Sequence, residues 1–271
     1  MTPQEMVSRL LYRDALMLVL DKPAGFAVHR GPKGGASLED HFDALRFGLP
    51  RRPALAHRLD RETSGCLVLG RHRKALAQLG RLFKSGAVEK TYWAVIENGP
   101  EVDEGVIELP LGRLDATRGW WMKHDPHGQP AVTKWRLLGR APLPGEEGLR
   151  LAWLALEPVT GRPPQLRVHC AEMGWPIVGD TIYGNAPRVG GPGLHLHARE
   201  VVLPLDKNRA PIRVVAPVPP PMCERLLQCG WQGEATELAP NSILPREAGK
   251  GNHAAQQRGG RGAGLDENSV S

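Results

Sequence analysis

The chain has 271 residues, 41% of them hydrophobic, so it is long enough for one large domain or two small ones with a sizeable core. Its net charge of +6 and pI of about 9.3 point to an anionic partner. No apolar run approaches a membrane span, no signal-peptide pattern opens the chain, and the four cysteines form no Cys-x-x-Cys pair. These features argue against an integral membrane protein, a disulfide framework and a zinc pattern, and we expect a soluble cytoplasmic protein.

The first predicted elements lie near the N-terminus. Residues 16–20 are an apolar run typical of a buried strand, and the Pro-Ala-Gly that follows predicts a turn. We expect residues 26–29 to return as the second strand of a hairpin. Ser37 as an N-cap, with Asp40 three residues later, predicts a helix that runs to Leu45.

The central stretch of the sequence is a charged loop that leads into a core strand. Residues 66–69 are apolar and suit a buried strand, and a Ser-Gly turn signal stands before them. Asp60 precedes this turn and is flanked by Arg58 and Arg61. Nearby cations favour the charged form of a carboxylate, so Asp60 is expected to be ionised and able to act as nucleophile, base or metal ligand. The alternative is a surface loop of salt bridges.

Basic residues cluster around this loop. Between residues 46 and 90 there are eleven Lys or Arg and three acids, a net charge of +8 in one segment. Within it, residues 72–84 predict a helix that ends at Gly86 and whose apolar stripe is Leu76, Leu79, Leu82 and Phe83. The cluster is either a solvated helix face or, as its position favours, a footprint for a phosphate backbone.

Strands and one helix are predicted in the second half. Residues 90–96, 120–123, 133–136 and 149–156 read as strands, the last with alternating faces. A helix is expected to open at Pro163-Pro164, because proline is tolerated in a first turn. Its predicted inner stripe is Leu166, His169, Cys170 and Met173, with Arg167 pointing elsewhere.

The C-terminal part contains two close histidines and then a change in composition. His195 and His197 share a strand face and could bind metal, but no third ligand follows at a convincing spacing, which favours a structural role. Strands are expected over residues 201–205 and 211–215, and a last helix over 219–229. We divide the chain into a folded domain, residues 1–233, and a disordered low-complexity tail, residues 234–271.

Several of these motifs together resemble one family. His-Arg-Leu-Asp, two residues and Thr-Ser-Gly around Asp60 resemble the active-site signature of the RluA-type pseudouridine synthases. The Lys-Pro-Ala-Gly turn before a Val-His, the Lys-x-Tyr that contains Tyr92, and the Gln-Leu-Arg-Val-His run that contains Arg167 are similar to further family motifs. The chain departs from the pattern at Pro163-Pro164, where members commonly have a pair such as Thr-His.

The resemblance covers most of the chain and implies a fold and an activity. The fold is α/β (α+β), with a central, largely antiparallel mixed sheet flanked by helices. The activity is the isomerisation of uridine to pseudouridine in tRNA and/or rRNA, with the base detached, turned and rejoined through a ring carbon, and without metal or cofactor. The resemblance also implies the short branch without an N-terminal RNA-binding module, and we expect a monomer.

The resemblance assigns roles to particular residues. Asp60 is the implied catalytic residue, Tyr92 lines the active site, and Arg167 is implied to pair with Asp60. Substrate binding is expected from His57, Arg58, Arg61, Thr63 and Gln165. Two alternatives remain: a catalytically inactive RNA-binding protein on the same fold, and a metal-dependent hydrolase that uses His195, His197 and Asp60.

Overall fold

The computed structural model describes residues 1–31, 34–114, 121–142 and 150–234. Within these residues the helices are α1 (Pro3–Ser8), the 3-10 helix η1 (Leu38–Leu45), α2 (Arg73–Lys84), α3 (Gln165–Glu172) and α4 (Pro220–Gln228). The strands are β1 (Leu10–Arg13), β2 (Met17–Lys22), β3 (Ala54–Leu55), β4 (Ser64–Gly70), β5 (Glu89–Glu97), β6 (Glu104–Glu108), β7 (Leu111–Arg113), β8 (Met122–His124), β9 (Val132–Pro142), β10 (Arg150–Pro158), β11 (Leu196–Leu203) and β12 (Ile212–Val215). None of the described helices is long and apolar enough to cross a lipid bilayer.

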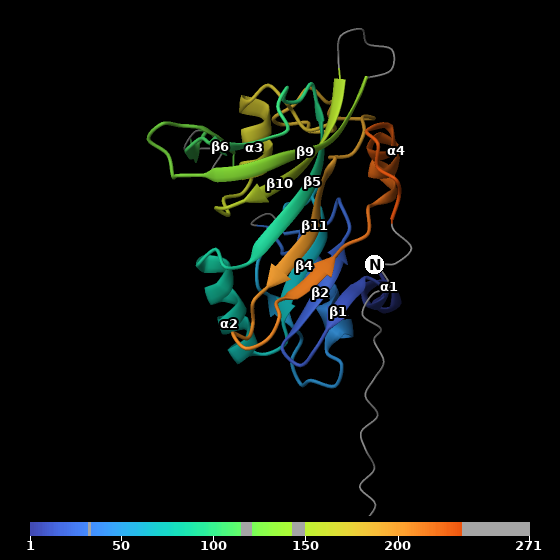
Figure 1. Ribbon diagram of the computed structural model, residues 1–271. Coiled ribbons are helices and arrows are strands. Elements are labelled where there is room, and N and C mark those ends of the chain that lie inside the picture. The colour runs from blue at the N-terminus through green and yellow to red at the C-terminus, as the bar shows by residue number, and fades with distance from the viewer. Residues whose placement is uncertain (32–33, 115–120, 143–149, 235–271) are drawn as a thin grey trace, which may run out of the picture.

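One long sheet runs through the molecule (Figure 1). Its strand order is β1-β2-β4-β11-β5-β10-β9-β6, with β3 beside β4 and β12 beside β11. The pairings are antiparallel except for β4 with β11, which is parallel. The predicted α/β architecture, a largely antiparallel mixed sheet flanked by helices, is confirmed.

The parallel contact between β4 and β11 depends on a glycine. Ser64 lies opposite His197, and Gly65 lies opposite Ala198. Gly65 has a φ of 104°, and a Cβ added there would lie 2.3 Å from the backbone oxygen of Ala198. Only glycine therefore fits where the chain leaves the Asp60 loop and enters the sheet.

The first half of the sheet is covered on both faces, which is why residues 17–20 of β2 and 66–69 of β4 are continuous apolar runs. On one face of these strands, side chains such as Val19 and Val68 pack with Leu79 of α2. On the opposite face, side chains such as Leu20 and Leu67 pack with Phe42 of η1.

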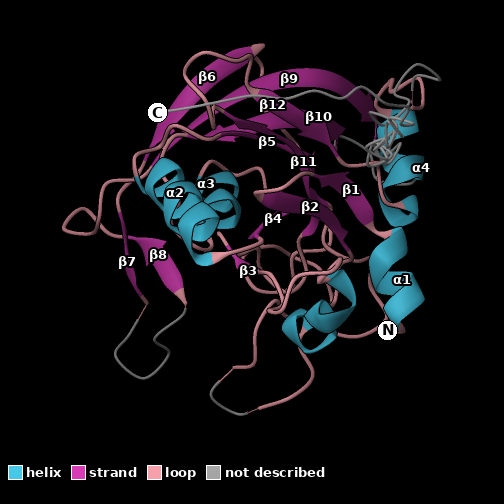
Figure 2. Cartoon of the chain, turned by 90° about the horizontal axis from the view of Figure 1, so that it is seen from below, coloured by secondary structure: helices cyan, strands magenta, loops and turns pink. Residues whose placement is uncertain are grey.

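The second half of the sheet is also sandwiched. Ala94, on one face of β5, belongs to a cluster with Leu166 of α3, whereas Val95, on the other face, packs with Met222 of α4. Figure 2 shows α1 and α4 toward one end of the molecule in that view, and α2 and α3 toward the other. The two covered faces explain why residues 151–156 of β10 are all buried instead of alternating as predicted.

Several predicted elements need correction. Residues 26–29 are not a strand, and β2 pairs with β1 and β4 instead of forming a hairpin with residues 26–29. The helix that begins after Ser37 is a 3-10 helix. Asp40 accepts the Ser37 backbone N–H at 2.8 Å, as in the expected capping box, but the Ser37 hydroxyl group has no hydrogen-bond partner among the described residues. The strand expected over 201–205 begins earlier, as β11.

The helix expected at Pro163-Pro164 also differs. It begins at Gln165, with Pro164 as the residue before its first turn. Met173 is 41% exposed and is not part of an inner stripe. Instead, residues 165–170 are buried all round, because the helix is inserted between the sheet and the β7–β8 hairpin.

The C-terminal boundary is marked by an ion pair. Glu234, where we expected the tail to begin, accepts two hydrogen bonds of 2.7 Å from the Arg199 guanidinium and one from the Val218 backbone N–H. The remainder of the predicted tail lies outside the described residues.

Candidate active site

A cavity of about 260 Å³ lies where the loop before β4, the end of α2 and the start of α3 meet. The loop contributes Asp60, α2 contributes Phe83, and α3 contributes Arg167. Tyr92 of β5 and Leu196 of β11 also line it. Segments more than a hundred residues apart in the sequence therefore build one site.

Asp60 is partly buried in this cavity. Burial raises the pKa of its carboxyl group above the usual value, while the charges of Arg167, Arg58 and Lys22 lower it. The cations act in the direction predicted from the sequence, but the effect of burial is opposite and larger. The carboxylate is therefore less well solvated than a loop aspartate, which makes it a stronger base and nucleophile.

Lys22 holds the loop that carries Asp60. Its side chain is fully buried, and its ammonium donates hydrogen bonds to the backbone oxygens of Pro23, Arg61 and Thr63 at 2.9, 2.9 and 2.7 Å. Burial lowers the pKa of Lys22 to about 8. These three contacts make Lys22 a structural support of the Asp60 loop.

Replacing Lys22 by Met should therefore loosen the loop. Three carbonyl groups lose their donor, which costs about 1–3 kcal/mol of folding free energy, and displacement of Asp60 slows turnover on the order of a hundredfold. Wild-type turnover should also decline above pH 8, because a neutral amine has two N–H groups for three acceptors. Single-turnover rates between pH 6.5 and 9.5 and thermal melts test this. Lys207→Met, at an exposed lysine, is the control, and full turnover by the Lys22→Met variant would contradict the role.

Arg167 pairs with Asp180, so the expected ion pair with Asp60 is wrong. Its Nε and Nη2 each donate a hydrogen bond of 2.7 Å to the two carboxylate oxygens of Asp180. Both side chains are buried, 8% and 1% exposed. Arg167 nevertheless lines the cavity, and its charge is the largest influence that lowers the pKa of Asp60. The charge of Arg167 lowers the pKa of Asp60 without a direct hydrogen bond, while Asp180 fixes the position of the guanidinium.

Asp180 has further partners that make it a fixed anchor. One of its oxygens accepts the backbone N–H groups of Ile182 and Tyr183 at 2.9 Å. Burial raises the pKa of Asp180, but the hydrogen bonds and charge of Arg167 outweigh it and hold the pKa below the usual value. The sequence reasoning missed this role, because no spacing signal joins residues 167 and 180 in that way.

His57 lines the cavity but is held by the protein itself. Its Nε2 accepts the backbone N–H of Val68 at 3.0 Å, and its ring stacks on Phe83 with centroids 4.5 Å apart. Burial, together with the charge of Lys90, lowers its pKa to about 3, so the ring is neutral. It fixes the start of the Asp60 loop against β4 and α2.

The other predicted binding residues divide into two groups. Arg58 and Thr63 line the cavity, the first exposed and the second buried. Gln165 also lines it, but its amide is engaged with Thr160, Val132 and Thr133 and closes the turn before α3. Arg61 is not at the cavity and donates instead to the backbone oxygen of Gly25 at 2.9 Å.

Tyr92 lies where the predicted site requires it. It packs against two hydrophobic clusters, one beneath α3 and one beneath η1, and it lines the cavity with Asp60. Burial, with the charge of Asp60, raises the pKa of its hydroxyl group. The phenol is therefore neutral, and its hydroxyl group has no hydrogen-bond partner among the described residues. It remains available to a substrate.

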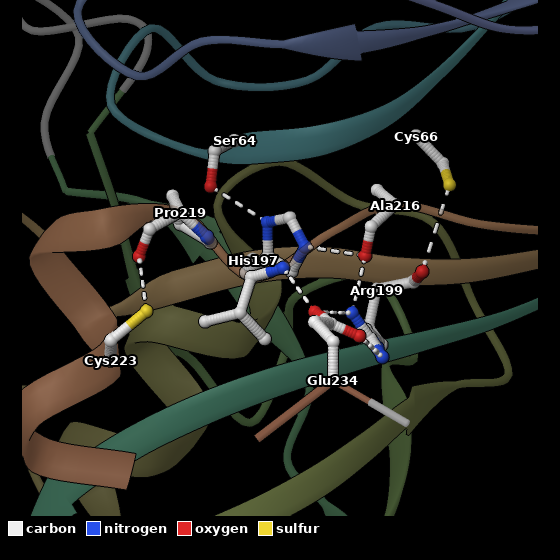
Figure 3. Close-up of polar contacts among 9 residues, drawn as sticks. Ser64, Cys66, His197, Arg199, Ala216, Pro219, Cys223 and Glu234 are labelled. Carbon is white, nitrogen blue, oxygen red and sulfur yellow. Dashed lines mark hydrogen bonds and ion pairs between the residues drawn. The ribbon is translucent and has the colours of Figure 1, made fainter. Parts of the chain in front are cut away.

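The two C-terminal histidines are structural. Figure 3 shows His197 between Ser64 and Ala216, and its Nδ1 lies 2.8 Å from the Ser64 hydroxyl group. His195 Nδ1 lies 2.8 Å from the backbone oxygen of Gly193. In the part of the chain that the structure describes, no three His, Cys, Asp or Glu side chains are grouped to hold a metal ion. The metal-dependent hydrolase is therefore not favoured.

Comparisons with known proteins agree with this fold. Residues 16–172 match the family model described as RNA pseudouridylate synthase. An uncharacterised RNA pseudouridine synthase of Zymomonas mobilis is 41% identical, over 79% of this chain and 95% of the relative. The solved structure of human RNA pseudouridylate synthase domain containing 4 superimposes with a TM-score of 0.68 at 27% identity, covering 84% of this chain and 95% of that one.

Two proteins of Vibrio cholerae are each 31% identical. The tRNA pseudouridine synthase C matches over 82% of this chain and 96% of its own length, and the ribosomal large subunit pseudouridine synthase C over 77% and 65%. The chain therefore belongs to the RNA pseudouridine synthase family of enzymes. Within that family it is an RluA-type member, as the motif around Asp60 indicated.

Proposed function

We propose that this chain converts specific uridines in structured tRNA or rRNA to pseudouridine, as a cytoplasmic monomer, with Asp60 as its catalytic residue. The observation that carries the proposal is one cavity that holds a desolvated carboxylate, a neutral tyrosine and a fixed arginine. Its volume of about 260 Å³ suits one flipped nucleotide base. The names of the Vibrio cholerae relatives support both classes of RNA as substrates.

Asp60 and Arg167 have different roles in the proposed reaction. The bond from the ribose carbon to uracil N1 breaks, the base turns, a bond to uracil carbon five forms, and the proton on that carbon leaves while N1 gains one. Asp60 is placed to act as nucleophile or base in this exchange. Arg167 stabilises its negative charge without neutralising it, because the guanidinium remains bound to Asp180.

RNA binding is assigned to the basic surroundings of the cavity. A uridine inside folded RNA must leave its stack, which costs a few kcal/mol. Arg58 is exposed at the cavity and carries no ion pair among the described residues, so it can contact phosphates or fill the vacated position. The +8 segment between residues 46 and 90 supports binding that weakens steeply as salt rises.

Pseudouridine mapping tests the proposal. Ribosomal RNA and tRNA from a strain that lacks the gene should lose one or more pseudouridines, and the wild-type gene should restore them while Asp60→Asn does not. Purified protein should release tritium from the same RNA labelled at uracil carbon five. Unchanged maps together with RNA binding would favour the inactive RNA-binding alternative.

Tyr92 should contribute both packing and proton transfer. Tyr92→Phe keeps the ring and removes the hydroxyl group, so RNA affinity should hold while the single-turnover rate falls on the order of a hundredfold. Tyr92→Ala should lose affinity as well, because the uracil loses its stacking partner. Binding and single-turnover assays on the same RNA separate the two effects. Equal rates for wild type and the Phe variant would restrict Tyr92 to packing.

A further inference from the structure

We propose that the exposed face of α2 is a docking surface for the phosphate backbone of the base-paired stem beside the target uridine. This inference rests on the proposed function, because it extends the same cavity onto the helix that forms part of its wall. The surface consists of Arg73, Lys74, Ala77, Gly80, Arg81 and Lys84, which are all exposed.

The first observation is unpaired charge. The helix contains these four cations and no acid. Among the described residues none of the four has an ion pair or a side-chain hydrogen bond. Some arginines elsewhere on the surface are paired, for example Arg30 with Asp40 and Arg46 with Asp43. A concentration of free cations on one helix is a site for an anionic polymer.

The second observation is position. Phe83 in the last turn of α2 lines the cavity and stacks on His57. Arg81 and Lys84 flank it in sequence, so the charged face begins at the cavity and extends away from it. Residues 73, 77, 80, 81 and 84 follow the spacing of one helical face, and eleven residues of α-helix span about 16 Å. A backbone that leaves the cavity therefore meets cations along that length.

The third observation is shape. Gly80 lies in the helix interior, where glycine is among the least favourable residues. A Cβ added there would meet nothing within 4 Å, so packing inside the protein does not require the glycine. Neither Gly80 nor exposed Ala77 places a long side chain between the two pairs of cations, so a phosphate backbone can approach the helix closely.

The chemistry of the face indicates the kind of RNA. Its exposed side chains include no aromatic group on which an unpaired base could stack. Flexible cations around two small residues contact phosphates and recognise the shape of a duplex instead of its sequence. The partner is therefore a base-paired stem, while the unpaired target nucleotide enters the cavity.

Binding to two probes tests the surface. One is an RNA hairpin with a ten-base-pair stem and a uridine-containing loop, and the other is the loop sequence alone as a short single strand. Arg73→Gln combined with Lys84→Gln should weaken hairpin binding by about tenfold and reduce the slope of log affinity against log salt by about 1 to 2. Binding of the single strand should change little. Arg225→Gln, a last-turn arginine on α4, is the matched control and should leave both unchanged.

Substitution at Gly80 tests the shape without a change in charge. Gly80→Ala should raise Tm by a few degrees and keep hairpin affinity, because alanine favours the helix and adds one methyl group. Gly80→Gln should remain folded but bind the hairpin several-fold more weakly.

Hairpin affinity and salt slope equal to wild type in the Arg73→Gln, Lys84→Gln variant would overturn the proposal, as would an equal loss in Arg225→Gln. These outcomes do not depend on pseudouridine formation, so failure of the surface and failure of the proposed function are distinguishable.

Discussion

Asp60→Asn should abolish pseudouridine formation and, at the same time, stabilise the folded protein at neutral pH. The amide keeps the size of the side chain but is neither a nucleophile nor a base, so turnover should fall at least about a thousandfold. Because burial raises the pKa of Asp60, ionisation of the carboxyl group costs folding free energy. The neutral amide avoids that cost, and Tm at pH 7 should rise.

The sign of the pH dependence follows from the same shift. Below the pKa of the unfolded aspartate the carboxyl group is protonated in both states, and wild type and variant should melt alike. The difference should appear as pH rises through the raised pKa of the folded state and be complete at neutral pH. The wild-type rate should fall in acid at a pH above the usual range of an aspartate, because turnover needs the ionised form.

Thermal melts from pH 3.5 to 8 and single-turnover rates measure both effects. Asp206→Asn, at an exposed aspartate in the β11–β12 loop, is the control and should change neither. RNA binding by Asp60→Asn should persist. An Asn variant that turns over near the wild-type rate would remove Asp60 from the chemistry, and one that melts lower than wild type at pH 7 would contradict the burial cost.

Breaking the Arg167–Asp180 ion pair should cause the second large loss, of both stability and turnover. Asp180→Asn removes the charge opposite a buried guanidinium, which costs about 3–5 kcal/mol, or a fall in Tm on the order of 10 °C. Turnover should fall because the guanidinium of Arg167, released from Asp180, pairs with the Asp60 carboxylate and neutralises it. The pKa of Asp60 should also move down, since a neighbouring negative charge is lost and the cation remains. The acid limb of the rate profile should therefore lie at lower pH.

A double variant separates folding from catalysis. Arg167→Met with Asp180→Asn leaves no unpaired buried charge, so it should recover much of the lost stability but not the turnover. Arg167→Lys should fold and lose most of the rate, because an ammonium cannot reproduce two parallel hydrogen bonds to one carboxylate. Wild-type stability in Asp180→Asn, or recovered turnover in the double variant, would contradict the assignment.

Local signals in the sequence determined much of the site. The capped start at Ser37, the buried strand after Asp60 and the basic helix after His72 depend on residues that are neighbours in the chain, and the structure confirms each of them. The motifs around Asp60 and Tyr92 are contiguous, so their resemblance to a family could be recognised without coordinates. The family was therefore identifiable from the sequence, and the comparisons confirm it.

Only the tertiary structure decided which charges face each other. Asp60, Lys22 and Arg167 lie on three separate segments, and nothing in their spacing shows that Asp180 takes both hydrogen bonds of Arg167. The pKa of Asp60 illustrates the reason. Flanking arginines can be read from the sequence, but burial depends on β5, β11 and α3 closing over the loop, and burial is the larger effect. Sequence gives the chemical groups, whereas desolvation and pairing are properties of the packed chain.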